Sequence, residues 1–241
     1  PQDVQGWTFD YPKSFFDRRM RQVRRQSPDI DEISSAAELL MSAKRPIIIA
    51  GGGVQYSGAV SELTNFAKIH NIPIVETIAG RANLLDSNPL NIGPIGVTGS
   101  NSANTIANKA DLIIAVGTRL QDFTTGSWTV FSMDSKFISI NAARHDATKH
   151  LSLPIVGDAK LALKTLSKAC SGFKASYEWM SFAQDERRKW NAYVSDNISV
   201  VNNRPNSYAQ AIGVVNAICD KRDRIVAAAG GLPAEVTANW R

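Results

Sequence analysis

Short apolar runs alternate with amphipathic segments along most of this chain. Residues 47–50 form a continuous apolar run rich in isoleucine, which is typical of a strand buried on both faces of a parallel sheet. The same reasoning predicts further strands at residues 74–76, 112–116, 137–140 and 154–156. Helical spacing is found between Asp31 and Pro46 and at residues 57–70, 100–108 and 158–170, with Asp29 or Asp31 and Asp158 as predicted N-caps. Strands that alternate with helices of this length predict an α/β fold, a doubly wound parallel sheet flanked by helices.

The segments outside this pattern divide the chain. Residues 1–30, aromatic and arginine-rich, are expected to form a connecting arm with one short helix at 14–24. Residues 31–172 form the predicted central α/β domain, and 173–206 a helical linker with a helix at 176–201 and a turn at 202–206. In residues 207–241 we expect a helix to 220 capped by Ser207, a strand at 224–229, and a turn that opens a further helix. A lone strand–helix start without its own sheet cannot bury its faces, so the sequence is expected to be a piece of a longer protein.

Candidate binding residues lie at the ends of the predicted strands. In open parallel sheets, ligands bind at the carboxyl ends of the strands, and glycines there let a ligand approach the backbone. The loops that meet this condition contribute Gly51, Gly52, Gly53, Thr77, Gly80, Gly117, Arg119 and Asp158. Together they favour a nucleotide or cofactor crevice, although each loop alone is more typical of a tight turn. Arg119 is expected either to clamp an anionic group or to pair with Asp122.

Composition narrows the classes of function. The 241 residues are 44% hydrophobic and 20% charged, as in ordinary globular proteins, and no apolar run approaches the length of a membrane span. The net charge of +5 is concentrated in the arm, at Arg18, Arg19, Arg21, Arg24 and Arg25, without a recognition motif, so we expect no nucleic-acid partner. The two cysteines, Cys170 and Cys219, are far apart, which favours a reducing, cytoplasmic setting over a disulfide framework. The three histidines have no metal-ligand spacing, and we predict no catalytic residue and no metal site in the chain.

The order of these segments resembles the central domain of thiamine diphosphate-dependent enzymes of the acetohydroxyacid synthase type. The landmarks are residues 45–53, 77–80, 96–101, 110–119 and 157–160, and the likeness extends over about residues 31–170. Within that superfamily, residues 1–6, 50–56 and 117–128 resemble the branch that hydrolyses a cyclic 1,2-diketone in inositol catabolism. Residues 207–241 are similar to the start of the diphosphate-binding domain of the same family, and Gly231 and Leu232 match the loop that donates backbone groups to the diphosphate.

The resemblance implies a three-domain enzyme that uses thiamine diphosphate and Mg²⁺, bound mainly outside this chain, to cleave a C–C bond of a cyclic diketone. The missing N- and C-terminal domains and a second copy of the whole protein are the implied partners, and the chain alone is expected to be inactive. Three other interpretations stay open. They are the middle domain of an acetohydroxyacid synthase-like carboligase, a stand-alone module that binds FAD or NAD, and a purely structural domain whose exposed faces are buried only against partner domains.

The resemblance also raises the question of flavin, because the related synthases hold FAD in this domain. Phe123 stands where a second arginine is expected, and Asn141 replaces the acidic strand end that would bind the adenosine side. A ribose hydroxyl is usually held by such a carboxylate. We therefore expect FAD binding to be weak or absent.

Overall fold

A six-stranded parallel sheet forms the centre of the protein. The computed structural model describes residues 2–20, 22, 24–200, 205–220 and 223–241. The strands are β1 (Pro46–Ala50), β2 (Ile74–Glu76), β3 (Asn91–Pro94), β4 (Leu112–Val116), β5 (Lys136–Asn141) and β6 (Leu153–Val156). Their order is β3-β2-β1-β4-β5-β6, and every neighbouring pair is parallel. The predicted doubly wound α/β fold is therefore confirmed, and the direction of winding reverses between β1 and β4.

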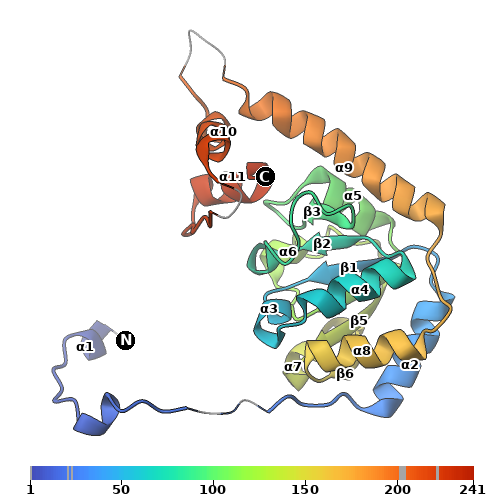
Figure 1. Ribbon diagram of the computed structural model, residues 1–241, viewed down its shortest axis with the longest axis horizontal. Helices are drawn as coiled ribbons and strands as arrows, with labels where there is room; N and C mark the ends of the chain where they lie inside the picture. Colours follow the sequence, from blue (N-terminus) through green and yellow to red (C-terminus); the bar gives the residue numbers. More distant parts are fainter. Residues whose placement is uncertain (1, 21, 23, 201–204, 221–222) are drawn as a thin grey trace.

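Two helical layers cover the sheet (Figure 1). One contains α2 (Ile30–Ser42), α4 (Val60–His70) and α8 (Ala159–Ala169), which pack against one another, and the other contains α5 (Asn101–Lys109) and α9 (Tyr177–Ile198). Shorter helices lie in the connections: α3 (Gly53–Ser57), α6 (Asp122–Thr125), α7 (Arg144–Ala147), and the 3-10 turns η2 (Ile78–Gly80) and η3 (Lys149–Leu151). Every residue of β1 and β4 is buried, which explains why their sequences are continuously apolar rather than alternating.

The helix ends follow the capping residues in the sequence. The side chains of Asp29, Ser100 and Asp158 accept hydrogen bonds from backbone N–H groups in the first turns of α2, α5 and α8. Ser207 and Gln210 form a reciprocal capping box at the start of α10 (Tyr208–Ile218). These contacts satisfy N–H groups that have no partner within the helix. The predictions at Asp29, Asp158 and Ser207 are confirmed.

Several local predictions were wrong. The helix predicted at 57–70 begins only at Val60, as α4, and a short helix that was not predicted, α3, precedes it. Gly58 separates the two, because its left-handed conformation (φ 62°) ends α3. Strand β3 was not predicted, and its glycine and proline explain why, since proline cannot donate to a ladder and is tolerated on an edge strand such as this one. The short helix expected at 14–24 is limited to the 3-10 turn η1 (Lys13–Phe15), although Arg21 and Val23 lie outside the described residues.

The two ends of the chain lie outside the sheet. The arm, which begins with α1 (Gln2–Gln5), extends away from the central layers, whereas α10 and α11 (Gly231–Asn239) pack together beside α9 (Figure 1). The strand expected at 224–229 is absent, because these described residues pair with no other strand. Most of the expected turn at 202–206 lies outside the described residues. No helix within the described ranges is both long and apolar enough to cross a bilayer.

Candidate functional site

A small crevice lies at the carboxyl ends of β1, β2 and β4, beside the point where the winding of the sheet reverses. Its volume is about 200 Å³. Five of the residues singled out from the sequence line it, namely Gly52, Gly53, Thr77, Gly117 and Arg119, together with Ile78, Ala79, Thr118, Gln121 and Thr124. Ligands of doubly wound sheets bind at this kind of switch point. The structure therefore brings these five predicted residues together, whereas Gly51, Gly80 and Asp158 do not line the crevice.

The glycines of this region are required by contacts between backbone segments. A Cβ on Gly51 would lie 2.3 Å from the carbonyl oxygen of Gly117, and one on Gly80 would lie 2.1 Å from the carbonyl oxygen of Ala50. A Cβ on Gly53 would lie 2.7 Å from the Cα of Gly117, which itself has a left-handed φ of 60°. The N–H of Gly53 donates to the Gly117 carbonyl at 3.0 Å. Close packing among the loops after β1, β2 and β4 thus accounts for these glycines, whether or not a ligand is bound.

Arg119 supplies the positive charge at the crevice. Its guanidinium is exposed and donates to Oε1 of Gln121 at 3.3 Å. Asp122, the alternative partner considered from the sequence, instead accepts a hydrogen bond from the Ser127 hydroxyl at 2.8 Å. No ion pair of Arg119 is found within the described part of the chain. Most of its hydrogen-bonding capacity is therefore free for an anionic group.

Asp158 serves a different purpose. Its carboxylate caps α8, accepts a hydrogen bond from the Ser57 hydroxyl at 2.8 Å and pairs with Arg25 of the arm at 2.6 Å. Burial alone would raise the pKa of Asp158, but the hydrogen bonds from Ser57 and Arg25 outweigh burial and lower it. The backbone N–H of Asp158 also donates to the carbonyl of Gln26 at 2.8 Å. Asp158 therefore fastens the arm to the central domain.

The structure also shows the positions of Asn141 and Phe123, the two residues that bear on flavin binding. The amide of Asn141 donates to the Thr118 carbonyl at 3.1 Å, and its Oδ1 accepts the N–H of Ala143 at 3.1 Å. Phe123 is 59% exposed. Both polar ends of Asn141 are thus engaged in holding loops, and neither residue adds a charge to the crevice.

A buried polar cluster beside the crevice was missed from the sequence. Glu76, fully buried at the end of β2, accepts a hydrogen bond from the Leu84 N–H at 2.9 Å and pairs with Arg81 at 3.2 Å. Burial raises the pKa of Glu76, an effect that Arg81 only partly opposes. Asn83 donates to the Gly51 carbonyl at 3.1 Å, and its buried Oδ1 has no partner among the described residues. An acidic residue that closes an apolar strand, followed five positions later by arginine, was the signal available.

Gly231 and Leu232 lie at the start of α11, apart from the crevice. Gly230 precedes them with a φ of 130°. A Cβ on Gly231 would meet only a ring carbon of Tyr208 at 4.0 Å, so no described contact requires glycine at this position. The first N–H groups of a helix have no partner within it and point outward, an arrangement that suits an anion. Across the described ranges, no three His, Cys, Asp or Glu side chains are grouped so that they could hold a metal ion.

The chain is similar in sequence and in fold to known proteins. The sequence profile of the thiamine pyrophosphate enzyme central domain matches residues 33–166. Over its whole length the chain is 36% identical to curated proteins named 3D-(3,5/4)-trihydroxycyclohexane-1,2-dione hydrolase from Geobacillus thermodenitrificans and Clostridium perfringens, of which it spans 41%. A putative thiamin diphosphate-dependent enzyme from Mycobacterium smegmatis has a similar fold, with a TM-score of 0.54 and 23% identity over 64% of this chain and 30% of that one.

Proposed function

We propose that this chain, which belongs to the thiamine pyrophosphate enzyme central-domain family, is the middle part of a hydrolase that opens the ring of a cyclic 1,2-diketone, trihydroxycyclohexane-1,2-dione, in inositol degradation. The observation that carries the proposal is the 36% identity to the hydrolases, which extends through the arm and the C-terminal helices as well as the central domain. A match confined to the sheet would support only the general family. The chain spans about two-fifths of those relatives, so the activity is proposed for a longer protein.

The proposed division into segments follows the contacts. Residues 31–172 are the supporting domain, 1–30 an arm that Arg25 fastens to it, 173–206 a helical linker and 207–241 the start of a diphosphate-binding domain. The crevice contains an arginine but no paired acid and base, and we assign no catalytic residue to this chain. Its role in the proposed reaction is to hold the neighbouring domains in place.

The residues at the start of α11 fit part of a thiamine diphosphate site. The open space at Gly231 and the N–H groups of Gly231 and Leu232 would accept an oxygen of the diphosphate. Such a cofactor, when bound, supplies the electron sink for cleavage of a C–C bond next to a carbonyl. The described residues do not fit Mg²⁺, because they provide no carboxylate cluster, so we propose that the metal ligands lie in the rest of the longer protein.

The crevice is proposed to bind FAD weakly or not at all. Its volume of about 200 Å³ is below the range of about 300–1,000 Å³ typical of pockets for larger ligands. Arg119 and the crevice-lining Gly52, Gly53, Thr77 and Gly117 could still hold one small anionic group. Titration of FAD into the purified chain should give no sub-micromolar binding and no change in the flavin spectrum. Sub-micromolar affinity with a perturbed flavin spectrum would contradict this proposal.

Assembly and location are also proposals. We infer a homo-oligomer for the longer protein from the family and a cytoplasmic location from the two free cysteines, Cys170 and Cys219. Neither nucleic acid nor membrane is proposed as a partner.

The deciding experiment is an assay of the longer protein that contains this chain. We expect thiamine diphosphate-dependent ring opening of the cyclic diketone, detected by loss of the substrate and appearance of the open-chain acid. Carboligation of pyruvate without ring opening would instead favour the acetohydroxyacid synthase-like alternative. Binding of a dinucleotide by the isolated chain, with no dependence on thiamine diphosphate, would favour the stand-alone module.

A further inference from the structure

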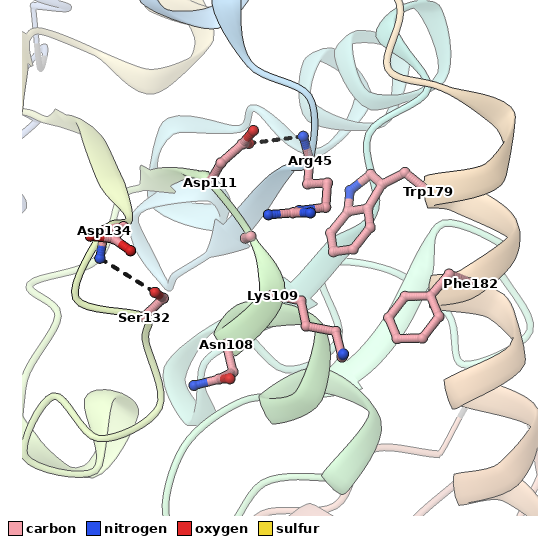
Figure 2. A pocket seen from close by; sticks show the side chains of 9 residues that line it. Arg45, Asn108, Lys109, Asp111, Ser132, Asp134, Trp179 and Phe182 are labelled. Atoms are coloured by element: carbon pink, nitrogen blue, oxygen red, sulfur yellow. Dashed lines mark hydrogen bonds between the residues drawn. The ribbon is translucent and has the colours of Figure 1, made fainter.

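A second hollow lies at the amino-terminal edge of the strands, opposite the crevice. Its volume is about 510 Å³, within the range of small-molecule sites. It is formed where the chain enters β1 and β4, by the C-terminus of α5, by the loop before β5 and by the first turns of α9. Figure 2 shows the side chains that line it. Neither the family nor the glycine pattern predicts a ligand at this edge.

Two cationic side chains reach into the hollow without a carboxylate partner. The guanidinium of Arg45 makes no ion pair or hydrogen bond within the described part of the chain, and it lies between Asp111 and Trp179 (Figure 2). The ammonium of Lys109 lies 5.6 Å from the centre of the Phe182 ring. Two positive groups from different segments thus line the same hollow, and neither has a carboxylate partner among the described residues.

An aromatic wall stands beside these cations. The rings of Trp179 and Phe182, one turn apart on α9, are nearly parallel (20°), with their centres 5.8 Å apart. The indole N–H of Trp179 donates to the carbonyl of Pro46 at 2.8 Å, which fixes the ring against the start of β1. Because these rings are already fixed, little conformational entropy is lost when a planar ligand packs against them.

The acidic residues of the hollow divide into two kinds. Both carboxylate oxygens of Asp111 are occupied, since they accept the backbone N–H groups of Lys44 and Arg45 at 2.8 Å each. Asp134 has an exposed carboxylate and lies with Ser132 on the side of the hollow away from Lys109 and Phe182 (Figure 2). The cations and aromatic rings therefore share one side, and the free acceptor lies on the other.

We propose that this hollow binds a small planar aromatic anion of the nucleoside monophosphate type. Its phosphate would be held by Arg45 and Lys109, its ring would lie along Phe182, which the buried Trp179 supports from behind, and a ring amine would donate to Asp134. An aliphatic anion would leave the aromatic wall unused, and an uncharged aromatic compound would leave both cations unpaired. The inference stands apart from the proposed function, because the site is complete within the described residues of this chain.

The test is titration calorimetry of the purified chain with three probes. Adenosine monophosphate should bind, whereas adenosine, which lacks the phosphate, and ribose 5-phosphate, which lacks the ring, should each bind at least about tenfold more weakly. Absence of binding by adenosine monophosphate at millimolar concentration would overturn the proposal. Equal affinity for adenosine monophosphate and either of the other probes would also overturn it.

Matched variants locate the site. Arg45→Gln and Lys109→Gln should each weaken binding by roughly tenfold, and Arg45→Gln keeps the backbone N–H that Asp111 accepts. Lys44→Gln, the adjacent exposed lysine that does not line the hollow, should leave the affinity within about twofold. Arg119→Gln tests the crevice at the opposite edge and should also have no effect. Loss of binding in Arg119→Gln, with binding retained in Arg45→Gln, would place the ligand at the crevice and refute the inference.

Discussion

Replacing Gly51 with alanine tests whether the glycines after β1 are needed for packing of the chain on itself. A Cβ at this position would lie 2.3 Å from the Gly117 carbonyl oxygen, 2.7 Å from the Cβ of Thr118 and 2.8 Å from the carbonyl carbon of Gly117. These atoms belong to the loop after β4 and cannot rotate away as a flexible side chain would. To reach an ordinary contact distance, the Gly117 carbonyl must move from 2.3 to 3.4 Å, a displacement of roughly 1.1 Å.

That displacement sets the expected cost. Overpacking of a rigid site destabilises a protein by about 1–3 kcal/mol. The hydrogen bonds from Gly51 N–H to the Val116 carbonyl (2.8 Å) and from Gly53 N–H to the Gly117 carbonyl (3.0 Å) join the same two segments and would be stretched. An intact bond of this kind contributes about 1 kcal/mol and a stretched one loses only part of that, so we expect Gly51→Ala to lower the free energy of unfolding by about 3 kcal/mol in total. For a domain of this size the melting temperature should fall by about 6–12 °C.

Urea unfolding followed by tryptophan fluorescence and circular dichroism measures this effect on the purified chain without a ligand. Gly231→Ala is the matched control, because its Cβ would meet only one atom, at 4.0 Å, and its stability should stay within about 0.5 kcal/mol of the parent. A Gly51→Ala protein as stable as the control would refute the packing argument. The glycine would then have to be explained by the approach of a ligand.

Two further predictions concern side chains away from the crevice. Asp158→Asn removes the charge that pairs with Arg25, so we expect a loss of about 1 kcal/mol and faster tryptic cleavage of the arm. Because the pKa of Asp158 is lowered in the folded state, its carboxylate stabilises the fold above the unfolded pKa of about 3.9, and the stability difference from Asp158→Asn should close as the pH falls through the folded pKa. Burial raises the pKa of the Cys170 thiol to about 11, so at pH 8 a thiol reagent should modify the partly exposed Cys219 quickly and Cys170 only after urea is added. Equal, rapid modification of both cysteines in the folded chain would contradict the burial of Cys170.

The sequence predicted the strands that are buried on both faces, because a continuous run of isoleucine, leucine and valine leaves few alternatives. It did not predict β3, whose four residues include Gly93 and Pro94 and whose place at the edge makes both tolerable. The strand expected at 224–229 has the right composition but pairs with no other described strand. Apolar pattern alone therefore indicates which residues favour a strand, and the available partner decides whether it forms.

The candidate site shows a similar limit. Thr77, Gly117 and Arg119 each follow a predicted strand, and that position alone correctly predicted that they lie at one edge of the sheet, where they line one crevice. The sequence did not reveal why residue 51 must be glycine, because the atoms that exclude a side chain there belong to a loop more than sixty positions later. The link between Arg25 and Asp158 spans an even longer separation. Contacts of this kind depend on how the layers are stacked, which spacing along the chain does not record.

The central place of β1 in the sheet has a consequence for the order in which the protein is made. Ile48 pairs with Ile74, 26 positions later, on one side and with Ile114, 66 positions later, on the other. During synthesis from the N-terminus, β2 is therefore available to β1 well before β4 exists. In that interval an apolar strand destined for the interior keeps one unpaired edge, which is a template for association with other chains. The second edge of β1 is therefore paired late in synthesis, and a nascent chain arrested before Val116 would depend on chaperones to stay dispersed.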